Sequence, residues 1–248
     1  MFVLTLWDTR RGKTIPGFQD GKWVWLAILA HVVLALVYTT PWDNYLIATG
    51  VWYYAPKLVS GVIFGYVPLE EYTFFVLETL LAGLTWWLLA RRLPASSDEF
   101  APSRELRLTT FIGLLLVWLL SLVILFSGWQ PGEYLSITLA WALPAIAPQI
   151  IVGADILWHY RKLVALNILS MTLYLSVVDA FAIASGSWTI NAARSTGIFI
   201  GALPIEEALF FLVTAALVTF GVTLLLSDMT RQRFTVWRES MRGNTARV

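Results

Sequence analysis

Six stretches of this chain are almost continuously apolar, and each is about as long as a lipid bilayer is thick. These stretches are residues 23–40, 72–90, 108–126, 134–152, 161–180 and 205–226. A helix needs about 20 apolar residues to cross the hydrocarbon core of a bilayer, and such runs are typical of membrane-spanning helices. The pattern therefore predicts an all-α fold, a multi-span integral membrane helix bundle.

The composition agrees with a membrane protein. Hydrophobic residues make up 58% of the 248 residues and charged residues 13%, whereas soluble domains carry about 25% charged residues. The chain has no cysteine, which excludes disulfides, thiol nucleophiles and cysteine metal ligands. It also lacks the H-E-x-x-H zinc motif and the G-x-G-x-x-G dinucleotide motif. We therefore predict no metal site, and the sequence identifies no cofactor and leaves flavin dependence open.

Basic residues are concentrated on one side of the predicted bundle. Groups of Lys and Arg lie within residues 10–22, 91–107, 161–162 and 231–247, and six spans place all of these groups on the same side. Lys57 and Arg194 fall on the other side, where they pair either with acidic residues or with lipid headgroups. Because cytoplasmic loops carry an excess of Lys and Arg, we predict a multi-pass cell-membrane protein with both termini in the cytoplasm.

A motif with two adjacent glutamates occurs twice, 136 residues apart. Residues 68–75 read PLEEYTFF and residues 204–211 read PIEEALFF, and 12 of the 33 positions from 43 to 75 recur unchanged at this offset. The spans at 23–40 and 161–180 also correspond and run in the same direction. We therefore predict two parallel tandem repeats, related by an axis along the membrane normal.

The repeat divides the chain into five segments. They are the cytoplasmic N-terminal segment 1–22, the first repeat 23–107, a linking span and loop 108–133, the second repeat 134–227 and a basic cytoplasmic tail 228–248. The span at 134–152 has no counterpart helix in the first repeat, because that helix would start before residue 1. Either the first repeat has lost this helix or the chain begins late.

Residues 45–67 and 181–203 are apolar but interrupted by glycine and polar residues. We interpret them as re-entrant or interfacial segments that cap the outer ends of the bundle, because irregular backbone at membrane depth needs protein or a cavity around it. Each contains a G-x-x-x-G, at Gly61/Gly65 and Gly197/Gly201. A glycine in an irregular loop explains either pair alone equally well, but the repetition in register favours close helix packing.

Helix lengths place the acidic residues of both repeats at one depth. From Lys22 to Asp43 is 21 residues, as is Glu70 to Arg91, and 21 residues form about 31 Å of helix, close to the bilayer core of ~30 Å. We predict that the acids gather beneath the caps as catalytic residues. They are Glu70, Glu71, Glu206, Glu207, Asp43 and Asp179. The alternative is that Pro followed by glutamates marks an ordinary helix start, but recurrence in register favours a shared site.

Aromatic residues recur beside these acids and are the predicted substrate-binding residues. They are Phe74, Phe75, Phe210, Phe211, Trp52 and Trp188. Two carboxyl groups close together in an apolar site do not both ionise easily, which provides a proton donor beside an acceptor. Aromatic faces stabilise a cation, and an apolar cap keeps water away from it. These features favour acid-initiated rearrangement of a lipid-soluble olefin.

The segments around the acids resemble the membrane-embedded lycopene cyclases. They read TPWDNY (40–45), GVWYY (50–54), GYVPLEEYTFF (65–75), LYLSVVDAFAIASGSWTIN (173–191) and GALPIEEALFFLVT (201–214). The chain is similar to the tandem fusion of the two heterodimer-type lycopene beta-cyclase subunits, without an attached phytoene synthase. Its departures from the family include Glu78 at a position where an uncharged residue is expected.

The resemblance implies an isomerase of the intramolecular lyase type. Its reaction would be the non-redox, proton-initiated cyclisation of lycopene end groups to ionone rings, which gives gamma- and beta-carotene. The implied partners are the carotenoid substrate, membrane lipid and other carotenoid-pathway enzymes, with no nucleic acid. The acid and base roles among the glutamates, the number of ends cyclised and the oligomeric state stay open.

Two other classes share some of these features. A proton-coupled transporter would also combine tandem repeats with buried acids, but here the acids lie at one end and the repeats are parallel. Another isoprenoid-modifying membrane enzyme is the second alternative. The chain lacks the NDxxD clusters of the diphosphate-dependent prenyltransferases.

Overall fold

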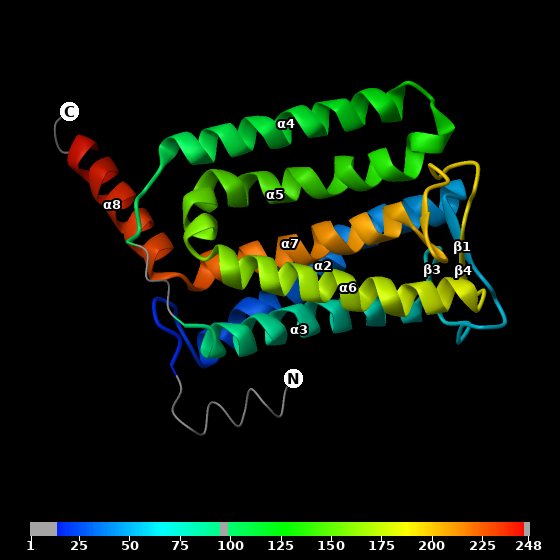
Figure 1. The fold of residues 1–248 in the computed structure, drawn as a ribbon, viewed down its shortest axis with the longest axis horizontal. Coiled ribbons are helices and arrows are strands. Elements are labelled where there is room, and N and C mark those ends of the chain that lie inside the picture. Colours follow the sequence, from blue (N-terminus) through cyan, green and yellow to red (C-terminus); the bar gives the residue numbers. More distant parts are fainter. Residues whose placement is uncertain (1–13, 95–98, 246–248) are drawn as a thin grey trace.

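The computed structural model describes residues 14–94 and 99–245, and within them six long helices lie side by side (Figure 1). The helices are α2 (Lys22–Thr49), α3 (Leu69–Arg92), α4 (Arg104–Phe126), α5 (Glu133–His159), α6 (Arg161–Ala184) and α7 (Ile205–Leu226). Each is long and apolar enough to cross a membrane. The six predicted spans are therefore confirmed as helices. The predicted missing counterpart of the 134–152 span concerns residues that lie outside the described part of the chain.

The helices differ from the predicted spans mainly in being longer. α2 continues through Pro41 and ends at Gly50, whose left-handed conformation (φ 73°) closes the helix. α3 and α7 each begin directly after a proline, Pro68 or Pro204, in extended conformation. Proline has no backbone N–H to donate to a preceding turn, so a helix can begin at or directly after it. The two glutamates that follow the proline therefore fall in the first turn of each helix.

The core lies between α2, α3, α6 and α7. Trp86 of α3 is fully buried there and donates from Nε1 to Thr223 of α7 at 2.8 Å. Asn167 of α6 is also fully buried, and its amide donates to the hydroxyl of Thr219 at 2.8 Å. Buried polar groups require such partners, and the Trp86–Thr223 bond joins a helix of the first predicted repeat to a helix of the second. α4 packs against α5 at the edge of the bundle and leaves most of its side chains exposed.

One end of the bundle carries short strands, so the all-α prediction was incomplete. Within the described residues there are three two-stranded sheets. β1 (Trp52–Tyr54) pairs with β4 (Trp188–Ile190), β2 (Ile63–Phe64) with β3 (Val67–Pro68), and β5 (Phe199–Ile200) with β6 (Leu203–Pro204), all antiparallel. The β1–β4 pairing joins the two segments predicted as caps, with Tyr53 opposite Thr189. Aromatic and β-branched residues suit such pairing, which satisfies backbone groups that a loop would leave open.

The glycines predicted to pack helices lie in turns instead. Gly61, Gly65, Gly197 and Gly201 all have positive φ, from 65° to 82°. A G-x-x-x-G contact requires a helical backbone, and these residues sit in and around the β2–β3 and β5–β6 hairpins. The prediction of glycine-mediated helix packing was therefore wrong. Left-handed turns, which glycine adopts without steric cost, are what these positions require.

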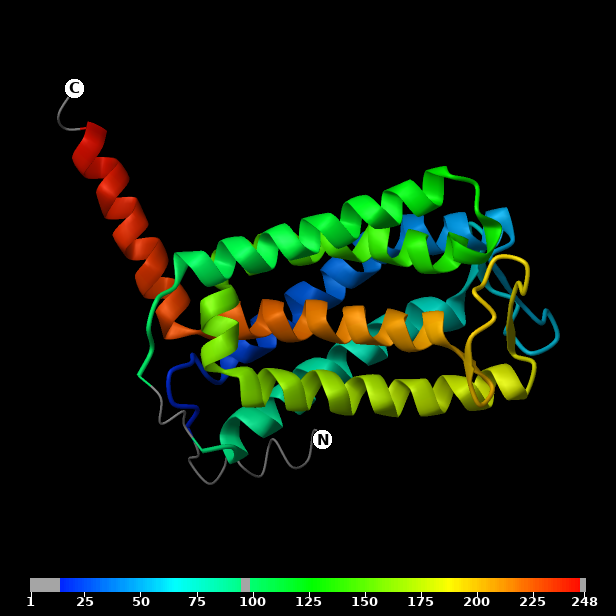
Figure 2. The same ribbon diagram turned by 45° about the horizontal axis from the view of Figure 1, so that its top comes forward.

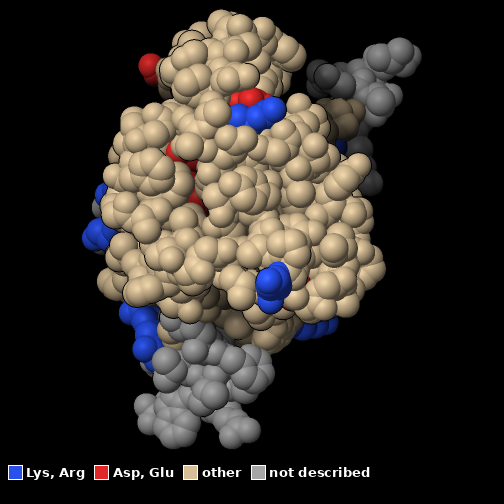
Figure 3. Space-filling model, turned by 90° about the vertical axis from the view of Figure 1, so that its right-hand side faces the viewer, with Lys and Arg blue, Asp and Glu red and all other residues tan. Residues whose placement is uncertain are grey.

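The opposite end carries α8 (Asp228–Thr245) and many of the basic side chains. α8 leaves the bundle at an angle (Figure 2), and Arg233 holds it through a bidentate contact with the buried Asp155 of α5, at 2.9 and 2.7 Å. α5 bends before this point, at Gly153, where its backbone leaves the helical conformation. Figure 3 views the strand end and shows few charged side chains there.

Candidate active site

A small cavity of about 70 Å³ opens where the strands meet the helix ends. Its lining comes from both predicted repeats, and the part from the second repeat includes a residue of α5. The lining residues are Trp42, Asp43, Trp52, Glu71, Phe74, Phe75, Tyr134, Asp179, Trp188, Ile190, Glu207, Phe210 and Phe211. All six predicted substrate-binding aromatic residues are among them, together with some of the predicted acids.

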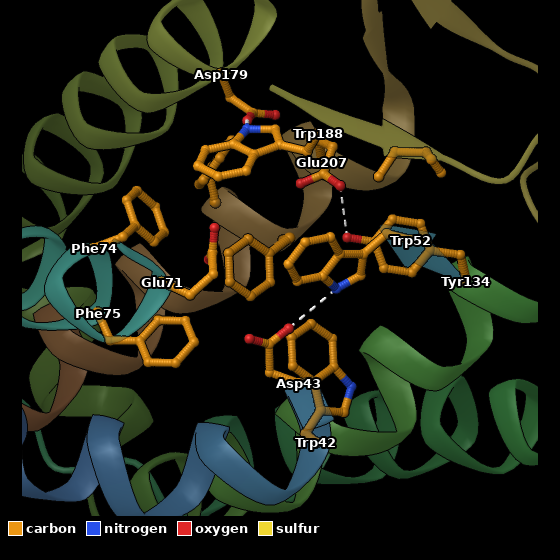
Figure 4. A pocket seen from close by; sticks show the side chains of 13 residues that line it. Trp42, Asp43, Trp52, Glu71, Phe74, Phe75, Tyr134, Asp179, Trp188 and Glu207 are labelled. Carbon is orange, nitrogen blue, oxygen red and sulfur yellow. Dashed lines mark hydrogen bonds between the residues drawn. The ribbon is translucent and has the colours of Figure 1, made fainter. Parts of the chain in front are cut away.

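Four carboxyl groups reach this cavity, each from a different helix. Asp43 comes from α2, Glu71 from α3, Asp179 from α6 and Glu207 from α7 (Figure 4). Asp43 is 3% exposed, and Glu207 is also buried. Four acids in so small and apolar a space cannot all be charged at modest cost. The cavity therefore suits chemistry in which some of the carboxyl groups hold protons while others accept them.

Each aspartate is held by a tryptophan of the nearby strand. Trp52 Nε1 donates to Asp43 Oδ1 at 3.0 Å, and Trp188 Nε1 donates to Asp179 Oδ1 at 3.0 Å. Among the described residues neither Oδ2 atom has a hydrogen-bond partner. These two bonds tie β1 and β4 to the helices beneath them. They also leave one oxygen of each aspartate available to a ligand or to another acid.

Glu70 and Glu206, which were also predicted to be catalytic, do not line the cavity. The backbone N–H of Ser60 donates to Glu70 Oε1 at 2.6 Å. Thr196 donates to Glu206 Oε1 from both its backbone N–H and its hydroxyl, at 2.7 Å each. The first glutamate of each motif thus fastens the preceding loop to the helix start. The second glutamate enters the cavity.

Tyr134 is a site residue that the sequence analysis missed. It lies in the first turn of α5, is 3% exposed, and donates from its hydroxyl to Glu207 Oε1 at 2.7 Å. Its backbone N–H donates to the carbonyl of Arg194, whose guanidinium pairs with Glu133 at 2.6 Å. Arg194 therefore pairs with an acid outside the repeated motif. No signal within the repeat pointed to Tyr134, because its counterpart would lie before residue 1.

Trp42 is the second missed residue, and it stacks against two other rings. Its ring lies 5.4 Å from that of Phe210 with an interplanar angle of 4°, and 4.6 Å from that of Trp141 at 21°. Phe74 and Phe211 meet edge to face at 6.1 Å. The equivalent of Trp42 in the second repeat is Val178. The aromatic lining is therefore asymmetric, although the carboxyl groups come equally from both halves.

A family model described as lycopene cyclase matches residues 19–88 and 133–225, which is more than half of the chain. The chain belongs to the lycopene cyclase family. The two matched regions contain all four acids of the cavity and also Tyr134, whereas α4 lies between them.

Curated lycopene cyclases of different lengths are similar to this chain. A lycopene beta-cyclase of Halobacterium salinarum is 41% identical over 202 residues, which cover 82% of this chain and 83% of the relative. A bifunctional lycopene cyclase/phytoene synthase of Podospora anserina is 34% identical over 206 residues, which cover 80% of this chain but 35% of that longer protein. No solved structure matches the chain.

The cavity of this lycopene cyclase family member is lined by four carboxyl groups. Within the described residues, no group of three or more His, Asp or Glu side chains is arranged to hold a metal ion. The chemistry that this arrangement supports directly is proton transfer between carboxyl groups beside aromatic faces.

Proposed function

We propose that this protein cyclises the acyclic end groups of lycopene to ionone rings, giving gamma- and beta-carotene, without a net change in oxidation state. The observation that carries the proposal is the convergence of Asp43, Glu71, Asp179 and Glu207 in one aromatic cavity, in a chain of the lycopene cyclase family. The relatives named as lycopene beta-cyclases support the same substrate and reaction.

The proposed reaction consists of one proton gain and one proton loss. A carboxylic acid protonates the terminal double bond of the end group, which leaves a tertiary carbocation. The neighbouring double bond attacks this cation and closes the ring, so the positive charge moves into the ring. A carboxylate then removes a ring proton and forms the ring double bond. Because one proton enters and one leaves, the product is an isomer of the substrate.

We assign the acid to Glu71 and the base to Glu207. The support for this assignment is the hydroxyl of Tyr134, which donates to Glu207 Oε1 at 2.7 Å. A hydrogen bond donated to a carboxyl group favours its ionised form, and an ionised carboxylate is what the base must be. Asp43 and Asp179, each held by a tryptophan, act as relays or orient the glutamates.

The aromatic lining stabilises the carbocation in this mechanism. The rings of Phe74, Phe75, Phe210 and Phe211 line the same cavity as the glutamates, and Figure 4 shows Phe74 and Phe75 beside Glu71. The face of an aromatic ring carries negative charge density and attracts a cation within about 6 Å. The paired strands β1 and β4 cover the cavity and limit the access of water, which would otherwise capture the cation.

The same proposal includes the arrangement of the chain in the membrane. We propose that residues 23–107 and 134–227 are tandem repeats like the two fused cyclase subunits, and that the α8 end with both termini faces the cytoplasm. In support, the Asp–Trp bonds, the loop-to-glutamate bonds and the β2–β3 and β5–β6 hairpins each recur 136 residues apart. The partners would then be lycopene, membrane lipid and neighbouring enzymes of the carotenoid pathway.

The test is expression of the chain in bacteria that accumulate lycopene, followed by chromatography of the extracted pigment. We expect lycopene to be replaced by gamma- or beta-carotene, and the chromatogram will show whether one or both ends are cyclised. Unchanged lycopene in cells whose membranes contain the protein would contradict the proposal.

A further inference from the structure

Two larger cavities continue from the candidate active site along the bundle. The nearer one has about 300 Å³ and lies between α2, α3, α5 and α7; its lining includes Phe75, Glu78, Trp141, Ala145 and Phe210. The farther one has about 560 Å³ and reaches α8. Both are mostly apolar, and neither belongs to the cavity that holds the four acids.

The three cavities lie end to end along the bundle, in a path defined by the lining residues that they share. Phe75 and Phe210 line both the active-site cavity and the nearer one. His31, Leu34 and Gln149 line both the nearer and the farther one. On α7 the path runs from Phe210 to Leu225, which is about 22 Å at 1.5 Å per residue. A groove of this length, parallel to the helices, fits an elongated ligand better than a compact one.

Three polar side chains that line the nearer cavity form hydrogen bonds with the protein. His31 Nδ1 lies 2.7 Å from the carbonyl oxygen of Ala27, and Gln149 Nε2 donates to the carbonyl of Leu217 at 3.3 Å. Glu78 accepts a hydrogen bond from Thr214, the residue at its own position in the second repeat, at 2.5 Å. A ligand in the nearer cavity therefore meets mainly hydrocarbon, which suits a polyene. Arg231 and Arg238 of α8 line the farther cavity.

The groove opens sideways between α2 and α5. These helices meet where the Tyr38 hydroxyl donates to the carbonyl of Trp141 at 2.8 Å and their rings stack at 5.5 Å. One and two turns along α2 from there, Leu34 lines the groove and is 59% exposed, and His31 forms part of the floor. Figure 2 shows α2 crossing the bundle obliquely, so that it diverges from its neighbours. In a membrane this opening would face lipid, where a carotenoid dissolves.

We propose that this groove binds the unreacted polyene chain of the linear substrate while one end group reacts in the acid-lined cavity. The inference rests on the proposed function, and it adds a binding site and a lateral entrance to it. Phe75 and Phe210 stand at the junction, where the end group passes from the groove to the acids. The length of the substrate, and not its end group alone, then contributes to recognition.

Filling the groove tests the proposal. Ala145 is half-buried and lines the nearer cavity but not the acid-lined one, so Ala145→Phe should narrow the groove and leave the acid-lined cavity intact. The matched control is Ala165→Phe on the exposed face of α6. Each variant is assayed in membranes with lycopene and with a truncated carotenoid that keeps one acyclic end group but lacks most of the polyene.

We expect Ala145→Phe to lower conversion of lycopene about tenfold or more, as exclusion of a few carbons from a pocket does. Its conversion of the truncated substrate should equal that of the wild type, and the control variant should convert both substrates.

Equal conversion of lycopene by Ala145→Phe and by the wild type would overturn the proposal that the groove binds the polyene. If Ala145→Phe converts neither substrate, Leu34→Trp at the lateral opening is assayed in the same way. Loss of lycopene conversion with normal conversion of the truncated substrate would support the groove, and wild-type conversion of both substrates would overturn it. Failure of the wild type itself on both substrates would count against the proposed function.

Discussion

Tyr134 and Glu207 lie 73 residues apart in the chain, and the Tyr134 hydroxyl donates a 2.7 Å hydrogen bond to Glu207 Oε1 in the cavity. This bond is the clearest difference between the two halves of the site, because Tyr134 belongs to α5, outside the repeated motif. It distinguishes two glutamates that the repeat makes equivalent, and the first prediction follows from it.

Tyr134→Phe should reduce cyclisation about 10- to 100-fold while the protein still accumulates in membranes. A hydrogen bond to a charged group contributes roughly 1.5–3 kcal/mol, and about 1.4 kcal/mol corresponds to a factor of ten in rate. The control is Tyr174→Phe, since Tyr174 is exposed on α6. Carotenoids are quantified by chromatography and the protein by immunoblot. Wild-type activity in Tyr134→Phe would remove the basis for assigning Glu207 as the base.

Replacing each glutamate of the two motifs by glutamine should separate their roles. Glutamine keeps an oxygen that accepts hydrogen bonds but transfers no proton. Glu71→Gln and Glu207→Gln should therefore lower activity about 10²- to 10⁴-fold, the usual contribution of general acid–base catalysis. Glu70→Gln and Glu206→Gln keep the contacts with Ser60 and Thr196, so we expect losses below about tenfold. If Glu70→Gln were as inactive as Glu71→Gln, the assignment of the first glutamate to the loop would be wrong.

The two Asp–Trp bonds should differ in their effect on stability. Trp52→Phe leaves Asp43, which is 3% exposed, without its indole donor, and an unsatisfied buried polar group costs about 1–3 kcal/mol. Trp188→Phe affects the half-buried Asp179, where water replaces part of the lost bond. The thermal midpoint of purified protein should therefore fall more for Trp52→Phe. Trp237→Phe on the exposed face of α8 serves as the control, and equal midpoints for all variants would refute this account.

A disulfide across β1 and β4 should form and should leave the enzyme active. Tyr53 lies opposite Thr189 in the antiparallel register, where paired residues are close enough for cross-linking, and the chain has no cysteine of its own. Tyr53→Cys/Thr189→Cys should be cross-linked on oxidation, as detected by mass spectrometry of its peptides, whereas the single variants should not. Activity should persist because substrate enters between α2 and α5. If activity were lost on oxidation and recovered on reduction, the result would show instead that β1 and β4 must separate during the reaction cycle.

The absence of native cysteine also allows a test of orientation. We expect Lys57→Cys, in the segment that carries β1 and β2, to react with a membrane-impermeant maleimide in intact cells. Lys162→Cys, at the start of α6, should react only after the membrane is permeabilised, because we propose that the basic end faces the cytoplasm. The reverse labelling pattern would invert the proposed topology.

Much of the helix bundle was predictable because the length of an apolar run reflects the thickness of a bilayer. The prediction was less accurate in the two caps. Residues 52–54 and 188–190 pair with each other although they are 136 residues apart, and local patterns carry little information about such distant pairing. The glycine spacing at 61 and 65 was misread for a related reason, since the same four-residue interval occurs in a helix and across a hairpin turn.

The sequence by itself determined that this chain forms apolar helices, and it predicted that an aspartate and a pair of glutamates from each half of the chain lie at the same level. The tertiary structure alone decided which glutamate of each pair enters the cavity. Neighbouring residues on a helix point about 100° apart, so when α3 and α7 pack into the bundle, Glu71 and Glu207 face its centre while Glu70 and Glu206 turn toward the loops. The tertiary structure also added Tyr134 to the site, because that contact depends on where α5 begins in space and not on any pattern within the repeat.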